Sequence, residues 1–170
     1  MKYVLGARCI RCGAEYEALP TITTCKCGGI LDIQYNYSAI RDHFSPADLS
    51  QCRDYSMWRY RPFLPVEEDS PAPPLRVGWS PLYRAQRLAG VLGLRELYIK
   101  DDGQNPTASL KDRASAMAVV KALEAGADTI ACSSTGNAPA AQAGNAAAAG
   151  LSTNNFVPPP APHGKSIPFA

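Results

Sequence analysis

The sequence lacks any apolar run approaching the roughly 20 residues that a membrane-spanning helix needs, and it shows no internal repeat. Residues 1–6 contain one lysine and too short an apolar run for a secretory signal. Charged residues make up 19% of the 170 residues and leave a formal net charge of only +2, without a lysine or arginine stripe. We therefore expect a cytoplasmic protein with no membrane partner and no nucleic-acid partner.

Six cysteines in a reducing compartment are better interpreted as metal ligands or buried thiols than as disulfides. Four of them form two pairs, each followed by glycine: Cys9, Cys12, Cys25 and Cys27. Two such pairs on facing hairpins can supply a tetrahedral zinc site that has no open position for catalysis. The second pair has one residue fewer than the usual spacing, and a metal-free cluster is the alternative. We predict a structural zinc site.

Composition divides the chain into four parts. Residues 1–37 hold the cysteine cluster and two strand-like runs, which predict a small zinc-ribbon-like β module. Residues 38–80 are irregular and aromatic, and we expect a connector that wraps the domain after it. Residues 81–150 alternate strands and helices. Residues 151–170, rich in asparagine and proline, are expected to form an irregular tail or truncated end.

Residues 81–150 indicate an α/β domain. We expect helices at 83–92, 109–125 and 138–149, and strands at 96–100 and 129–133. Strands and helices that alternate with short links favour a parallel sheet. Two parallel strands cannot close a core of their own, so we expect this domain to be incomplete.

One segment places a lysine where a ligand would bind. Residues 100–113 read Lys-Asp-Asp-Gly-Gln-Asn-Pro-Thr-Ala-Ser-Leu-Lys-Asp-Arg, which puts Lys111 in the first turn of a helix that follows a strand. The positive end of the helix dipole disfavours a second positive charge there, and imine formation requires a neutral amine. Ligands of open α/β sheets bind beyond the carboxyl ends of the strands. On charge alone, a solvated surface lysine beside Asp112 and Arg113 is the simpler interpretation.

The next strand is followed by a second polar loop, Ser133-Ser-Thr-Gly-Asn137. Hydroxyls, a glycine and free amides at a helix N-terminus can hold a carboxylate or a phosphate. An ordinary helix cap explains the same residue types. A lysine and an anion cradle on two consecutive strand-to-helix loops indicate a binding site more strongly than either does alone.

Several segments, in the order in which they occur, resemble the threonine synthases. Asn105–Arg113 is similar to their lysine motif, and Ser134–Asn137 to their asparagine loop. Residues 9–37, 58–65 and 78–83 are similar to the ribbon, the connector and the substrate-side turn of the zinc-ribbon members. The resemblance covers nearly all of residues 7–150 and extends to the fold type II pyridoxal-phosphate (PLP) enzymes as a group.

This resemblance implies a parallel, three-layer αβα sheet of the tryptophan synthase β-like type. It implies that Lys111 is the catalytic residue that holds PLP, and that Asn137 hydrogen-bonds the phenolic oxygen of the cofactor. Ser134, Thr135 and Gly136 would bind the substrate carboxylate. The implied reaction is that of a carbon–oxygen lyase in threonine biosynthesis, which converts O-phospho-L-homoserine and water to L-threonine and phosphate. We expect a homo-oligomer.

The chain departs from the family pattern in three ways. Leu110 stands where the family usually has phenylalanine, and Gly144-Asn145 interrupts a helix that the family fills with better helix formers. The chain is also less than half the family's length, so we expect it to be inactive alone. One alternative is another fold type II lyase, such as a cysteate synthase or a threonine dehydratase, although dehydratases usually lack the cysteine ribbon. The other is a non-catalytic zinc-ribbon interaction fragment.

Overall fold

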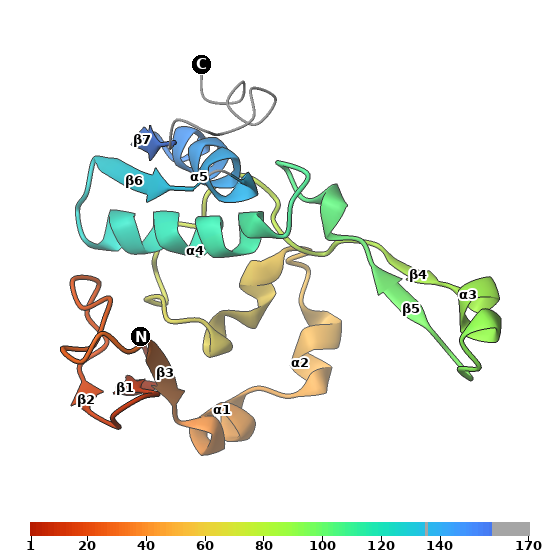
Figure 1. The fold of residues 1–170 in the computed structure, drawn as a ribbon. Helices are drawn as coiled ribbons and strands as arrows, with labels where there is room; N and C mark the ends of the chain where they lie inside the picture. The colour runs from red at the N-terminus through yellow and green to blue at the C-terminus, as the bar shows by residue number, and fades with distance from the viewer. Residues whose placement is uncertain (135, 158–170) are drawn as a thin grey trace.

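The computed structural model describes residues 1–134 and 136–157. Figure 1 shows a small sheet at the N-terminus, a helical segment, an α/β unit and an arm that extends away from them. The predicted site residue Thr135 lies outside the described residues, as do residues 158–170. Within the two described ranges, no helix is long and apolar enough to cross a membrane.

The N-terminal sheet has three antiparallel strands in the order β2-β1-β3. They are β1 (Val4–Cys9), β2 (Glu15–Tyr16) and β3 (Leu31–Tyr35). The tight turn between β1 and β2 depends on Gly13, whose φ of 75° lies in the left-handed region that side chains disfavour. This sheet lies where residues 1–37 predict a small β module, and it brings the two cysteine pairs together.

The connector contains three helical elements: α1 (Tyr37–His43), α2 (Pro46–Gln51) and the 3₁₀ helix η1 (Met57–Phe63). The expectation of an irregular segment is therefore wrong for these residues. Each element has its own start signal, and α2 begins with a capping box in which Ser45 and Asp48 bond each other's backbone. Such short helices are stabilised mainly by packing, which the aromatic composition of the segment does not reveal.

Connector side chains pack on one face of α4 (Lys111–Glu124). The buried members of this cluster are Met57, Trp58, Val66, Val77, Ala116 and Val120. A second contact lies near the end of α4, where Glu124 accepts a bond from the backbone N–H of Glu67 at 2.9 Å. Burying a large apolar side chain contributes roughly 1.5–3 kcal/mol, so this cluster fixes the connector on α4.

The α/β unit consists of α4, β6 (Thr129–Ser133), α5 (Asn137–Ala148) and β7 (Ser152–Phe156). Strands β6 and β7 are parallel, with Thr129 opposite Ser152. Helix α5 packs against both strands, and α4 packs against β6. Val119, Ala146 and Leu151 form the buried core of the unit. The expectation of an irregular tail is wrong for β7, because its backbone pairs with β6 despite a polar sequence.

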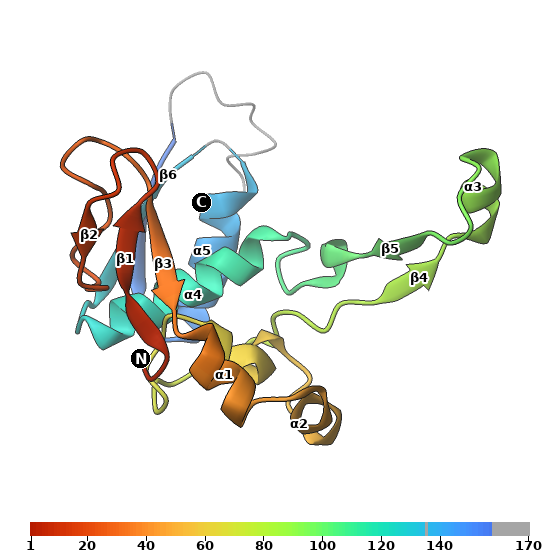
Figure 2. The ribbon, with the colours of Figure 1, turned by 90° about the horizontal axis from the view of Figure 1, so that it is seen from below.

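The arm is built from β4 (Leu82–Arg84), α3 (Gln86–Val91) and β5 (Tyr98–Lys100). Sequence analysis predicts a strand at 96–100 in a parallel sheet with 129–133, but β5 pairs antiparallel with β4 instead. Only residues 85–97 separate β4 from β5, so this pairing closes a smaller loop than pairing of β5 with β6 would. Figures 1 and 2 show the arm reaching away from the other elements. The chain is thus mixed α/β, with a two-stranded parallel pair in the described part.

Candidate functional site

Lys111 is the first residue of α4 and directly follows a tightly folded segment, the lysine loop (residues 105–110). After β5 the chain makes the 3₁₀ turn η2 (Asp102–Gln104), and then a turn in which the N–H of Ala108 donates to the carbonyl of Asn105 at 2.8 Å. Ala108 has a φ of 55°, a left-handed conformation that costs energy for a residue with a side chain. Lys111 itself is exposed. The loop therefore places a lysine with an exposed side chain at the start of a helix.

Asp112, directly after Lys111, points inward and is completely buried. Its Oδ2 accepts from the backbone N–H of Thr107 at 2.9 Å and from the Thr107 hydroxyl at 2.8 Å. Its Oδ1 accepts from Nδ2 of Asn145, on α5, at 2.8 Å. The interpretation of Asp112 as a surface partner of the lysine is wrong, because these three donors replace the water that a carboxylate loses on burial.

Gly144 and Asn145 are where α5 contacts the lysine loop. A Cβ added at Gly144 would lie 2.9 Å from the methyl carbon of Thr107, so only glycine allows this approach. Asn145 is fully buried and donates both to Asp112 and to the carbonyl of Ala141 at 2.8 Å. Sequence analysis treats this pair only as a weak point in the helix. The available signal was a glycine beside a polar residue within an alanine-rich helix, since such glycines usually have a packing reason.

A second network holds the other end of the lysine loop. Arg113 binds Asp102 at two points, with Nε–Oδ2 and Nη2–Oδ1 distances of 3.0 and 2.8 Å. The Ser80 hydroxyl donates to the same carboxylate at 2.5 Å, and Asn105 accepts from the N–H of Gly78 at 2.9 Å. The bonds from Arg113 and Ser80 hold the pKa of Asp102 well below its usual range. Residues 78–80 are thereby attached to the lysine loop.

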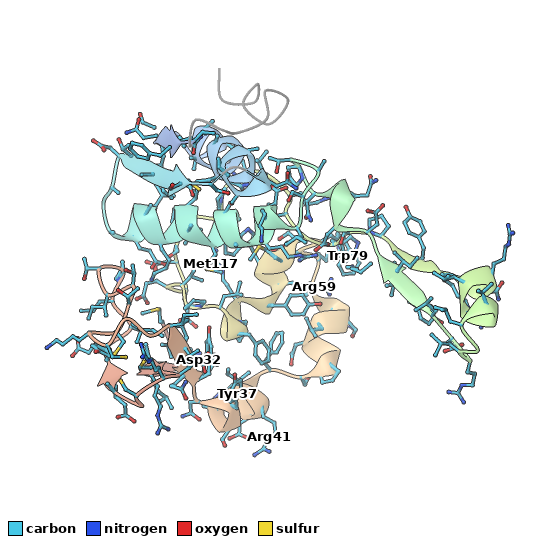
Figure 3. All side chains as sticks on the ribbon, in the orientation of Figure 1. Asp32, Tyr37, Arg41, Arg59, Trp79 and Met117 are labelled. Atoms are coloured by element: carbon cyan, nitrogen blue, oxygen red, sulfur yellow. The ribbon has the colours of Figure 1, made fainter. Side chains whose placement is uncertain are left out.

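Trp79 stands exposed in the middle of this attached segment. Its φ of 51° is left-handed, and its ring is 4.4 Å from the guanidinium carbon of Arg59 in the connector. Figure 3 shows the two side chains together where the connector meets the base of the arm. The centroids of the Tyr55 and Trp79 rings are 5.0 Å apart. A cation–π contact and an aromatic contact therefore stabilise an unfavourable backbone conformation beside the lysine loop.

The asparagine loop leads into α5, whose first residue, Asn137, is exposed. Ser134 accepts a bond from the N–H of Gly136 at 3.2 Å. Among the described residues no side chain caps α5, so its first N–H groups carry partial positive charge that an anion can use. In both Figure 1 and Figure 2 the N-terminal ends of α4 and α5 lie on the same side of the unit. The start of α4, which carries Lys111, and the start of α5 therefore lie on one side of the unit.

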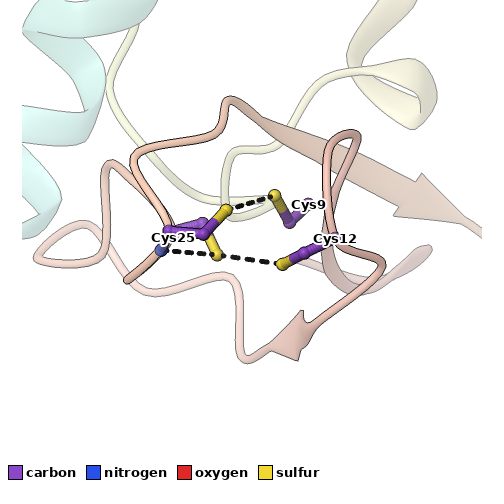
Figure 4. A group of neighbouring side chains, drawn as sticks. Cys9, Cys12 and Cys25 are labelled. Carbon is purple, nitrogen blue, oxygen red and sulfur yellow. Dashed lines mark hydrogen bonds between the residues drawn. The ribbon is translucent and has the colours of Figure 1, made fainter.

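The four clustered cysteines converge on one point of the N-terminal module. All four sulfur atoms lie within 4.8 Å of one another. Figure 4 shows the close pairs, in which Cys9 is 3.6 Å from Cys27 and Cys12 is 3.5 Å from Cys25. Sulfur atoms at about 2.3 Å from a tetrahedral zinc ion are about 3.8 Å apart. The short Cys25–Cys27 spacing therefore does not prevent a tetrahedral arrangement, and the four sulfurs fit a zinc ion.

Neighbouring groups shift the pKa values of two thiols in this cluster in opposite directions. The hydroxyl of Tyr16, 3.1 Å from the sulfur of Cys25, lowers the pKa of that thiol to about 6. Hydrogen bonding with Cys25 raises the pKa of Cys27 to about 12, because the two sulfurs compete for protons. A Cβ added at Gly29 would lie 2.6 Å from the sulfur of Cys9, so the chain can pass the cluster only as glycine.

Comparison with known proteins adds independent evidence. Residues 74–167 match the family model described as pyridoxal-phosphate dependent enzyme. The chain is 43% identical over 143 residues to the threonine synthase of Methanocaldococcus jannaschii, which covers 84% of this chain and 35% of that protein. It is also 43% identical over 152 residues to the threonine synthase of Methanosarcina acetivorans, covering 89% and 36%. The chain thus spans about a third of the length of these curated relatives.

Proposed function

This chain belongs to the family of pyridoxal-phosphate-dependent enzymes, and from that premise we propose that the protein acts as a threonine synthase. It would convert O-phospho-L-homoserine and water to L-threonine and phosphate, in the cytoplasm and as a homo-oligomer. One observation carries the proposal. Lys111, exposed at the start of α4 within a tightly held loop, lies in the stretch that is 43% identical to two threonine synthases. Because the chain spans about a third of those relatives, the activity, substrate and assembly of the whole protein are all part of the proposal.

The residues present fit this cofactor, because an exposed amine and an uncapped helix start can receive an aldehyde and an anion. When bound, PLP supplies an electron sink for charge that develops on the substrate carbons. Lys111 would hold the cofactor through Nζ and would then take and return protons at those carbons. Asn137 would orient the cofactor by a hydrogen bond to its phenolic oxygen. Ser134, Thr135 and the N–H of Gly136 would bind the substrate carboxylate, where the dipole of α5 favours negative charge.

The position of Lys111 is tested in the full-length protein by borohydride reduction with PLP, followed by peptide mapping. We expect the pyridoxyl label on Lys111, and we expect Lys111→Ala to abolish phosphate release from O-phosphohomoserine. A label on Lys100 or Lys121 would contradict the assignment. Conversion of threonine to 2-oxobutanoate without phosphate release would favour a dehydratase. The absence of both activities would favour the non-catalytic alternative.

We propose separately that Cys9, Cys12, Cys25 and Cys27 hold a structural zinc ion. Four convergent sulfurs, two of which (Cys9 and Cys25) belong to thiols with a lowered pKa, support this proposal. Such a site would stabilise the N-terminal module, where three short strands have little apolar core. Its role would be structural, since four thiolates leave the metal no position for a substrate.

A further inference from the structure

We propose that Asn145 is a positioning residue for Lys111 and that it acts through the carboxylate of Asp112. The inference rests on the proposed role of Lys111. Asp112 follows Lys111 directly in the chain and is completely buried, so its side chain anchors the first turn of α4. That anchor is held by two separate elements, Thr107 in the lysine loop and Asn145 on α5.

The two oxygens of Asp112 are held differently. Thr107 supplies two donors to Oδ2, whereas Asn145 supplies the bond to Oδ1. The charged neighbour Arg113 does not help, because its guanidinium is engaged by Asp102. Without Asn145, Oδ1 would be a buried carboxylate oxygen that has lost its bonding donor, which is strongly unfavourable. The carboxylate would rotate toward water or take up a proton, and the turn that carries Lys111 would shift with it.

The same bond connects the two helices that carry the proposed cofactor contacts. Lys111 is the first residue of α4, and Asn137 is the first residue of α5. Asn145 lies on α5 two turns after Asn137, and Gly144 beside it lets α5 approach Thr107 closely. The Asp112–Asn145 bond therefore sets the spacing between Lys111 and Asn137, which one bound cofactor must reach at once. A misplacement of about 1 Å at such a site can cost about a hundredfold in rate.

Gln142 provides a matched control on the same helix. It is buried to a similar degree, and its Nε2 has no hydrogen-bond partner within the described part of the chain. Replacing Gln142 by alanine removes a buried amide from α5 without removing a bond to the lysine loop. Replacing Asn145 by alanine removes a buried amide together with that bond. Comparing the two variants separates the bond from general packing of the helix.

The experiment uses the full-length protein and titrates PLP itself, followed by visible absorbance and visible circular dichroism. We expect Asn145→Ala to weaken PLP binding about tenfold and to reduce the circular dichroism of the bound cofactor, which reports how rigidly it is oriented. Gln142→Ala should change the affinity by less than about twofold. The double variant Asp112→Ala with Asn145→Ala tests the bond itself, because Asp112→Ala alone already removes it. Adding Asn145→Ala to Asp112→Ala should therefore weaken PLP binding much less than Asn145→Ala does in the unmodified protein.

Three results would overturn this inference. Asn145→Ala and Gln142→Ala could weaken PLP binding equally. Asn145→Ala could lower the melting temperature while binding and circular dichroism stay unchanged. The effects of Asp112→Ala and Asn145→Ala on PLP binding could also be fully additive. Failure of the proposed function looks different, because Lys111→Ala would then bind PLP with the same spectrum as the unmodified protein. The coupling between Asp112 and Asn145 can still be measured in that case, by unfolding without PLP. The four proteins compared are the unmodified protein, the two single alanine variants and the double variant.

Discussion

Arg113 forms two hydrogen bonds to the carboxylate of Asp102. This ion pair joins η2, before the lysine loop, to α4 after it. The Nε–Oδ2 and Nη2–Oδ1 distances are 3.0 and 2.8 Å. The loop that carries Lys111 is therefore closed by this pair on one side and by the Asp112–Asn145 bond on the other. The first and second residues after Lys111, Asp112 and Arg113, make these two closures, which fix the backbone beside Lys111 while its side chain is exposed.

The first prediction concerns the pH dependence of this ion pair. Arg113 and Ser80 lower the pKa of Asp102 in the folded state, so the pair stabilises the fold above the unfolded pKa, about pH 4. That contribution is lost as the pH falls below this value toward the folded pKa. We expect Asp102→Asn to lower the free energy of unfolding by about 1 kcal/mol at pH 7, and the difference to shrink below about pH 4. Urea unfolding of the full-length protein over this pH range measures both.

Glu96→Gln is the control for this prediction. Glu96 pairs with Arg84 on the arm at 3.1 Å, and both side chains are largely exposed. Exposed pairs contribute little, so Glu96→Gln should change the free energy of unfolding by less than about 0.5 kcal/mol. An Asp102→Asn effect that stays constant from neutral to acid pH would show that the ion pair is not its source.

The second prediction concerns zinc. We expect the purified full-length protein to contain one zinc ion per chain, and the double variant Cys9→Ser and Cys12→Ser to contain none. Gly29→Ala should also lower the zinc content, because its Cβ would lie 2.6 Å from the sulfur of Cys9. Gly90→Ala is the control, because no described atom lies within 4 Å of a Cβ added at this position of α3. It should leave the zinc content unchanged. Metal analysis under reducing conditions decides, and a metal-free wild-type protein would contradict the proposal.

Tyr16 gives a third, pH-dependent prediction for the same cluster. Its hydroxyl lowers the pKa of Cys25 to about 6, and so helps the thiolate compete against protons for the metal. Tyr16→Phe removes this donor, raises the pKa of Cys25, and should shift acid-induced zinc release to higher pH. Tyr37→Phe, at an exposed tyrosine, should leave the midpoint unchanged. A Tyr16→Phe midpoint equal to the wild-type value would show that the hydroxyl does not support the thiolate.

The parts of the molecule that the sequence predicts are those formed by short contiguous motifs. The cysteine pairs and the turn before Lys111 are local, because glycine, proline and capping residues fix them within a few positions. Asn145, the partner of Asp112, is 33 residues away in the chain. The residues around Asn145 do not indicate which side chain it contacts. Strand β7 is equally hard to foresee, since backbone pairing with β6 determines it rather than its polar side chains. The sequence also does not predict the pairing of β5 with β4, because strand periodicity does not identify the neighbouring strand.

The last prediction concerns Gly144, where helix propensity and packing oppose each other. An alanine in the middle of a helix is more favourable than a glycine by about 1 kcal/mol. Gly90→Ala, near the end of α3, shows what an added methyl does where nothing among the described residues lies within 4 Å of it. At Gly144 the added methyl would lie 2.9 Å from the methyl carbon of Thr107 and would push α5 away from the lysine loop. We therefore expect Gly144→Ala to lower the free energy of unfolding by about 1 kcal/mol or more.

Shortening the partner side chain should reverse this effect. Thr107→Ser removes the methyl but keeps the hydroxyl that donates to Asp112, so it relieves the contact without breaking the bond. Combined with Gly144→Ala, it should restore most of the lost free energy of unfolding, and the two changes should be clearly non-additive. Chemical unfolding of the two single variants and the double variant measures this coupling. If Gly144→Ala instead stabilises the protein as Gly90→Ala does, helix propensity dominates at this position. The close approach of α5 to the lysine loop would then not require glycine.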